Sequence, residues 1–249
     1  MKAMILAAGL GTRLRPLTNT IPKPLLPIAG TPLIVWNLLL LKRHGFQDVI
    51  INLHHLGPMI EQAVGNGSKY GLRIYYSHEP VILGTGGAIK QAEPNFSGEP
   101  VLVLNGDTLF ELDLEALCAF HQRRQAAATL VLRSDPDAAR WGVVEVESDD
   151  RIVRITGRGR PDAAATKSRM FAGIHILNPR LLRDVPKGMP SSIIDAYVAA
   201  IQRGDLVAGY ELTGYWSDVG TPERYAHAEH DATSGLIRLS ERLSTAPLA

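Results

Sequence analysis

Short strand-like runs and stretches with helical periodicity alternate along the first part of the chain. Ala3–Ala8, Asp48–Leu53 and Leu72–Ser77 are typical of strands, whereas Leu33–His44 and Met59–Val64 repeat apolar residues at helical spacing. This alternation predicts parallel strand–helix–strand units in a doubly wound sheet. Ligands of such sheets bind outside the carboxyl ends of the strands, so the loop after the first strand is the first place to expect a site.

The second half of the chain contains further strands and helices. Residues 129–155 are rich in strand-forming side chains, and Phe171–Leu177 is a strand pattern with a central glycine. A helix is predicted for Ser191–Arg203, and another is predicted to begin after Thr221. Thr221 is a typical N-cap residue, and Pro222 suits the first helical position. We therefore predict an α/β fold with one domain and a Rossmann-like, doubly wound sheet that is mixed and mostly parallel.

The loop after the first strand has the composition of a phosphate site. Gly9–Thr12 allows the backbone to curl around a ligand, and clustered amide N–H groups favour an anion. Arg13 adds a planar fork of donors, and Lys23 adds a compact charge whose direction is restricted by Pro22 and Pro24. These residues predict a site for a polyphosphate. The alternative is a glycine turn with solvated arginines.

Two better-known phosphate loops do not match this sequence. The dinucleotide fingerprint needs a third glycine where Leu14 stands, and an acidic residue about twenty positions further on, near Thr31. The ATPase loop needs a Gly-Lys-Ser/Thr sequence that this loop lacks. A nicotinamide oxidoreductase is therefore disfavoured.

A second glycine cluster, Gly84–Gly87, stands where a helix is predicted to begin. Small residues permit flat contact by a base or ribose, and the Thr85 hydroxyl can donate or accept a hydrogen bond. A glycine-rich helix entry with no ligand is the alternative.

An acidic residue, Asp107, follows the apolar strand Pro100–Leu104. Mg²⁺ takes few protein carboxylates and completes its shell with phosphate and water, so Asp107 has suitable oxygen chemistry. A cap on the following helix is the alternative.

Composition limits the remaining possibilities. The 249 residues allow one large or two small domains, and 26 basic against 25 acidic residues give a net charge of +1. Bulk charge thus gives no indication of nucleic acid or a membrane as a partner. No apolar run reaches the roughly 18 residues of a membrane span, and the N-terminus leads directly into a strand. We expect a cytoplasmic protein.

The first loop also carries a resemblance. Gly9–Pro16, followed by Pro22-Lys23-Pro24, resembles the signature of the sugar-1-phosphate nucleotidylyltransferases, or nucleotide-sugar pyrophosphorylases. The chain looks most like their short bacterial mannose-1-phosphate guanylyltransferases and N-acetylmuramate-1-phosphate uridylyltransferases. The resemblance implies the nucleotide-diphospho-sugar transferase fold, with a catalytic domain over residues 1–230.

Within that domain, the resemblance implies a nucleotide-binding part at about residues 1–110 and a sugar-binding part at about 111–220. Residues 231–249 are expected to form a C-terminal helix or tail, without the left-handed β-helix domain of longer members.

The resemblance also implies roles for individual residues. Arg13, Lys23 and Asp107 would be catalytic, and Asp107 and Asp218 would hold Mg²⁺. Nucleotide contacts are implied for Leu6, Ala8, Gly9, Gly11, Thr12, Arg13, Glu79, Gly84, Thr85 and Gly86. Sugar contacts are implied for Asn105, Gly142 and Gly173.

One segment departs from the family pattern. Many members carry Glu-Lys-Pro on the sugar side, where this chain has Gly157-Arg158-Gly159-Arg160-Pro161. Arg158 or Arg160 could take the role of the lysine, but the glutamate has no obvious replacement.

The reaction implied is nucleotidyl transfer from an NTP to a sugar 1-phosphate, giving an NDP-sugar and pyrophosphate. We expect GTP and mannose 1-phosphate first, with Glu79 accepting from the guanine edge. UTP with N-acetylmuramate 1-phosphate, in cell-wall recycling, is the alternative. A regulatory paralogue that binds nucleotide sugars without turnover is a further alternative, and a homodimer is compatible with the sequence.

Overall fold

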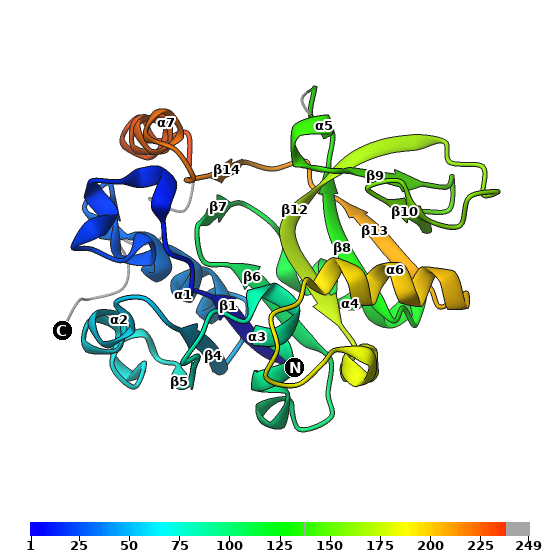
Figure 1. Cartoon of the computed structure of the whole chain (residues 1–249). Helices are drawn as coiled ribbons and strands as arrows, with labels where there is room; N and C mark the ends of the chain where they lie inside the picture. The colour runs from blue at the N-terminus through cyan, green and yellow to red at the C-terminus, as the bar shows by residue number, and fades with distance from the viewer. Residues whose placement is uncertain (137, 238–249) are drawn as a thin grey trace. The chain divides into compact units, whose positions relative to one another are not determined.

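The computed structural model describes residues 1–136 and 138–237, which divide into two compact units (Figure 1). The first, here called the N-terminal unit, contains Lys2–Ile82, Leu104–Asp113 and the described residues 214–237. The second, here called the middle unit, contains Met1, Leu83–Val103 and Leu114–Thr213. Because the chain passes repeatedly between them, residues far apart in sequence share each unit.

The N-terminal unit is built on three parallel strands joined by helices (Figure 1). In register, Ala3 of β1 lies beside Val49 of β4, and Asp48 of β4 lies beside Arg73 of β5. The elements are β1 (Lys2–Leu6), α1 (Leu33–Arg43), β4 (Asp48–Leu53), α2 (Gly57–Val64), η4 (Ser68–Tyr70) and β5 (Arg73–His78). This arrangement confirms the parallel units that the hydrophobic pattern predicts.

Shorter elements of the same unit surround the carboxyl ends of these strands. A two-stranded antiparallel ladder pairs β7 (Thr108–Phe110) with β14 (Trp216–Asp218), and therefore joins two segments that are distant in sequence. The predicted cap is also present, because the Thr221 hydroxyl accepts from the Arg224 N–H. The remaining elements are η1 (Thr12–Leu14), η2 (Leu17–Asn19), η3 (Lys23–Leu25), β2 (Pro27–Ile28), β3 (Thr31–Pro32) and α7 (Pro222–Thr233).

The middle unit contains a mixed sheet in which β12 pairs antiparallel with β8 and β9, and β13 pairs parallel with β8. Its strands are β8 (Ala128–Arg133), β9 (Val143–Val146), β10 (Ile152–Ile155), β11 (Arg158–Gly159), β12 (Lys167–Leu177) and β13 (Val207–Glu211). Its helices are α3 (Gly84–Ala92), η5 (Glu93–Phe96), α4 (Leu114–Arg124), α5 (Ala138–Trp141), η6 (Pro179–Asp184) and α6 (Ile193–Arg203). The strand β6 (Val101–Asn105) begins in this unit and ends in the N-terminal unit.

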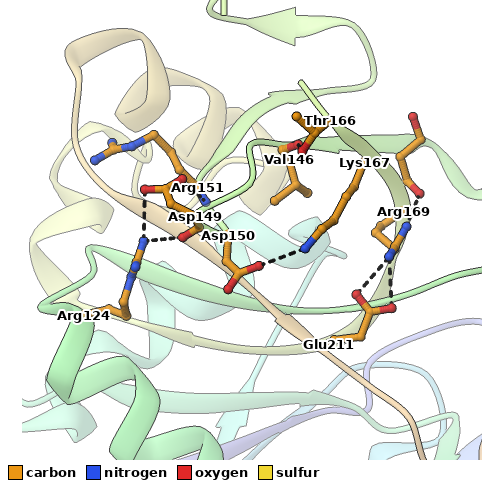
Figure 2. A network of polar contacts seen from close by, with 10 residues as sticks. Arg124, Val146, Asp149, Asp150, Arg151, Thr166, Lys167, Arg169 and Glu211 are labelled. Carbon is orange, nitrogen blue, oxygen red and sulfur yellow. Dashed lines mark hydrogen bonds and ion pairs between the residues drawn. The ribbon is translucent and has the colours of Figure 1, made fainter. Parts of the chain in front are cut away.

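Ion pairs connect residues on and beside the strands of the middle unit's sheet (Figure 2). Lys167 of β12 reaches Asp150 at 3.4 Å, and Arg169 contacts both carboxylate oxygens of Glu211 on β13 at 2.9 Å. Pairs as exposed as these contribute about 0–1 kcal/mol each. We therefore interpret this network as surface ion pairs that contribute little to the stability of the sheet.

The predicted α/β class with a mixed sheet is confirmed by these elements. The separate nucleotide-binding and sugar-binding parts stay a prediction. The C-terminal helix or tail expected at residues 231–249 falls largely outside the described residues, within which α7 ends at Thr233. Among the described residues, none of the helices combines the length and apolar character that a membrane crossing requires.

A buried histidine makes the middle unit sensitive to acid. His175 on β12 contacts the Tyr197 hydroxyl of α6 through Nδ1, and burial lowers the pKa of His175 to about 3. As the pH falls, the unfolded chain, whose histidine pKa is near 6.5, takes up this proton before the folded protein does. The contribution of His175 to the free energy of unfolding is therefore complete above pH 6.5 and is lost as the pH falls from 6.5 toward 3. At pH 5 the expected loss from this group is about 2 kcal/mol.

Urea unfolding at pH 7.5 and pH 5 measures this loss for the wild type and for His175→Asn. The variant is expected to be less stable at pH 7.5 but to lose less stability between the two pH values. Equal losses in both proteins would contradict the assignment.

Candidate functional site

The glycine-rich loop after β1 folds back onto the basic segment that follows it. Gly11 has φ +64°, and a Cβ there would lie 3.0 Å from Cγ2 of Thr18 and 3.4 Å from Cβ of Lys23. The Thr18 hydroxyl donates to the Gly11 carbonyl at 2.7 Å. Position 11 therefore favours glycine for two reasons: its backbone is left-handed, and the side chains of Thr18 and Lys23 leave little room for a Cβ. Leu6, Ala8, Gly9 and Thr12 belong to the same strand end and loop.

A buried pair of side chains holds the start of this loop, and one of the two, Asn52, has no predicted role from the sequence. Asn52, at the end of β4, accepts from the Ala7 N–H at 2.8 Å and donates to Glu79 Oε1 at 2.6 Å. Glu79 is 4% exposed, and its carbonyl contacts His54 Nδ1 at 2.7 Å. Glu79 thus supports the loop through Asn52. A polar residue near the end of a buried strand is the sequence signal that could have identified Asn52.

A close backbone contact places Asp107 beside the loop. The Gly106 N–H donates to the Leu6 carbonyl at 2.9 Å, and a Cβ on Gly106 would lie only 2.6 Å from that oxygen. Because a backbone atom blocks the space, residue 106 must be glycine for the turn after β6 to approach β1. Asn105 and Asp107 flank this glycine at the strand end.

The β7–β14 ladder brings Asp218 to the same place. Its register sets Asp218 opposite Thr108, and the Val219 N–H donates to the Asp107 carbonyl at 3.0 Å. The two aspartates, 111 positions apart in the sequence, therefore lie side by side in the N-terminal unit.

Three cations surround these two carboxylates. Lys23 Nζ lies 2.5 Å from Asp107 Oδ2 and 3.8 Å from Asp218 Oδ1, and its side chain is 9% exposed. Arg224 Nη1 lies 2.5 Å from Asp218 Oδ2. Arg13 also reaches this region, because a Cβ on Gly220 would lie 3.0 Å from Arg13 Nη2 and 2.6 Å from Asp218 Oδ1. We call these five residues, Arg13, Lys23, Asp107, Asp218 and Arg224, the carboxylate cluster.

Electrostatic forces oppose one another at Asp218. Burial and the nearby Asp107 carboxylate raise the pKa of Asp218, whereas Lys23, Arg224 and Arg13 act to lower it. Its Oδ1 atom is buried and has no hydrogen-bond partner among the residues that the structure describes. A buried oxygen left without a partner is costly unless a cation or another donor satisfies it.

The carboxylate cluster fits a divalent cation with few protein ligands. The described residues contain no group of three or more histidine, cysteine, aspartate or glutamate side chains suited to a metal. Two carboxylates suffice for Mg²⁺ when substrate phosphates and water complete the shell. The partnerless Oδ1 of Asp218 and the adjacent Asp107 carboxylate match that requirement.

In the middle unit, the second glycine cluster packs against the entry to α6. The Gly86 N–H donates to the Ser191 carbonyl at 2.9 Å, and the Thr85 hydroxyl accepts from the Ile193 N–H at 2.9 Å. A Cβ on Gly84 would lie 2.6 Å from the same Ser191 oxygen. These glycines therefore have a packing role, and their nucleotide role stays a prediction.

The predicted sugar-side glycines of the middle unit both need a left-handed backbone, with φ +93° at Gly142 and +76° at Gly173. Arg158, which could replace the family's lysine, donates to Asp195 at 2.9 Å at the surface. The sugar roles of Asn105, Gly142 and Gly173 also stay predictions.

Comparisons with known proteins agree on one class. A family model described as nucleotidyl transferase matches residues 2–235. The N-acetylmuramate alpha-1-phosphate uridylyltransferase of Neisseria meningitidis serogroup B is 40% identical, over 92% of this chain and 97% of that protein. The mannose-1-phosphate guanylyltransferase of Mycobacterium tuberculosis is 33% identical, over 94% of this chain but only 65% of its own length.

The fold is also found among solved structures. HddC from Yersinia pseudotuberculosis, complexed with GMP-PN, superposes with a TM-score of 0.75 at 26% identity, over 92% of this chain and 98% of that one.

Proposed function

The chain belongs to the nucleotidyl transferase family and is a sugar-1-phosphate nucleotidyltransferase; on that premise we propose that it joins UTP to N-acetylmuramate 1-phosphate with release of pyrophosphate. The observation that carries the chemistry is the carboxylate cluster, in which Lys23 lies between Asp107 and Asp218 beside the glycine-rich loop. A phosphate loop, two carboxylates and a buried ammonium group are what transfer between two polyanions requires.

The reaction exchanges one phosphorus–oxygen bond for another. An oxygen of the sugar phosphate bonds to the α-phosphorus in line with the bond to the β-phosphate, which breaks with its electron pair leaving on pyrophosphate. The attacking oxygen is already an anion, so the protein need supply neither a nucleophile nor a base. Repulsion between the two polyanions is the main barrier, and positioned cations lower it.

Four residues of the carboxylate cluster divide this work. Arg13 would hold the triphosphate and neutralise the leaving pyrophosphate, because its guanidinium forms paired hydrogen bonds with phosphate oxygens. Lys23 would neutralise the α-phosphate with its compact charge. Asp107 and Asp218 would hold Mg²⁺, which when bound neutralises phosphate charge.

The choice of UTP rests on two observations. The uridylyltransferase relative is 40% identical along nearly its whole length, against 33% for the guanylyltransferase. Glu79, whose carboxylate was expected to accept from guanine, is buried and engaged by Asn52. GTP with mannose 1-phosphate, expected first from the sequence, is the second candidate.

A substrate matrix tests the proposal. ATP, CTP, GTP and UTP are each paired with N-acetylmuramate, mannose and glucose 1-phosphates, and pyrophosphate release is measured with Mg²⁺ present. The highest kcat/KM is expected for UTP with N-acetylmuramate 1-phosphate. Nucleotide-sugar binding without pyrophosphate release from any pair would instead support a regulatory paralogue.

A further inference from the structure

Arg224 contacts the carboxylate cluster from the first turn of α7. Its Nη1 lies 2.5 Å from Asp218 Oδ2, with side-chain exposures of 29% for Arg224 and 11% for Asp218. The sequence alone indicates no role for Arg224, which lies two residues after Pro222.

The two oxygens of Asp218 have different surroundings. Oδ2 accepts the hydrogen bond from Arg224. Oδ1 is buried, has no hydrogen-bond partner within residues 1–136 and 138–237, and lies 3.8 Å from Lys23 Nζ. Holding one oxygen restricts rotation of the carboxylate, and so fixes the direction of the other. Oδ1 is the oxygen that lies near Lys23 Nζ, and the same ammonium group contacts Asp107 Oδ2 at 2.5 Å.

The backbone on both sides of this contact is itself fixed. The Thr221 side chain caps α7 by accepting from the Arg224 N–H at 3.4 Å, and Pro222 occupies the first helical position. Asp218 is held in the β7–β14 ladder, and the next residue bonds to the Asp107 carbonyl. The backbone of Arg224 is therefore held at the start of α7, beside the strand that carries Asp218.

We propose that Arg224 is a positioning residue, which holds Asp218 Oδ2 so that Oδ1 is presented to a divalent cation shared with Asp107. The inference rests on the proposed function in one respect, namely that this cation is the one used in nucleotidyl transfer. Hydrogen-bond partners of ligating carboxylates orient them, and their loss costs about 10–100-fold in metal affinity or activity. Arg224 would act in this way without touching substrate.

Binding of Mn²⁺ alone to the metal-free protein measures this role directly. The electron paramagnetic resonance signal of free Mn²⁺ is followed in titrations of the wild type, Arg224→Met and Arg224→Lys. Arg224→Met is expected to raise the Kd by about tenfold or more. Arg224→Lys, which keeps the charge and one donor, is expected to fall between Arg224→Met and the wild type.

The matched control is Arg73→Met, which removes another arginine–aspartate pair of the same unit. Arg73 contacts Asp48 at 2.6 Å and 2.8 Å, with a side chain that is 59% exposed. The Mn²⁺ affinity of Arg73→Met should equal that of the wild type. Unchanged or tighter Mn²⁺ binding by Arg224→Met, or equal weakening by Arg73→Met, would overturn the inference. If Arg224→Met fails to fold, the weaker binding expected of Arg224→Lys carries the same test.

Activity separates positioning from a direct role. In Arg224→Met, the Mg²⁺ concentration for half-maximal turnover should rise by about tenfold or more, while kcat at saturating Mg²⁺ stays within about threefold of the wild type. A fall in kcat that Mg²⁺ cannot restore would contradict positioning. Wild-type protein that binds Mn²⁺ but turns over none of the pairs would instead remove the proposed function.

Discussion

Replacing Lys23 with methionine is expected to lower kcat/KM by about 10³-fold while the protein stays folded. Lys23 is one of the most buried charged side chains of the carboxylate cluster. Because water screens a buried charge less, its electrostatic attraction to a phosphate is stronger than at the surface. Removing one positioned donor from such a site typically costs about 10²–10³-fold. Methionine keeps most of the side-chain volume, so loss of charge rather than of packing is tested.

Pyrophosphate release measures turnover in this experiment, and circular dichroism checks the fold. Lys42→Met is the matched control, because the Lys42 ammonium group donates to the Gly71 carbonyl at an exposed position. The control should retain wild-type kcat/KM. Activity of Lys23→Met within tenfold of the wild type would exclude Lys23 from the chemistry.

The location of this site could be predicted because its parts carry strong local signals. Gly11 and Lys23 belong to a loop that follows an apolar strand, and Asp107 lies in the turn after another strand. The carboxyl ends of neighbouring parallel strands meet at one edge of a sheet, which explains why such residues gather. Asp218 lies within reach because a short antiparallel ladder with β7 sets its register, as the structure shows.

The supporting contacts could not be predicted, because they depend on packing between distant segments. Asn52 joins Ala7 to Glu79, and nothing in the periodicity of β4 indicates those two partners. Arg224 resembles any exposed arginine in the first turn of a helix until β14 places Asp218 beside it. For Gly84 and Gly86 the sequence pattern is ambiguous. A glycine cluster that is typical of ligand contact also lets two segments pack closely, here against Ser191.

Replacing Asp107 with asparagine is expected to abolish turnover by a different route from Lys23→Met. The amide has the shape of the carboxylate but no charge, so it is a poor partner for both Lys23 and a divalent cation. Losing the several kcal/mol of charge stabilisation that a metal supplies should lower kcat by about 10³-fold or more. The backbone contact between Gly106 and Leu6 is unchanged by this substitution, so the turn should keep its place.

Mn²⁺ titration distinguishes the effect of Asp107→Asn from the effect of Lys23→Met. Asp107→Asn should lose both turnover and Mn²⁺ affinity, whereas Lys23→Met should lose turnover alone, because Lys23 contributes no ligand. Asp113→Asn is the matched control, since Asp113 is 66% exposed and lies 4.0 Å from His44 Nδ1. It should match the wild type in both measurements. Full Mn²⁺ affinity in Asp107→Asn would mean that the cation binds elsewhere, and the two carboxylates would then have to be reinterpreted as a site for Lys23 alone.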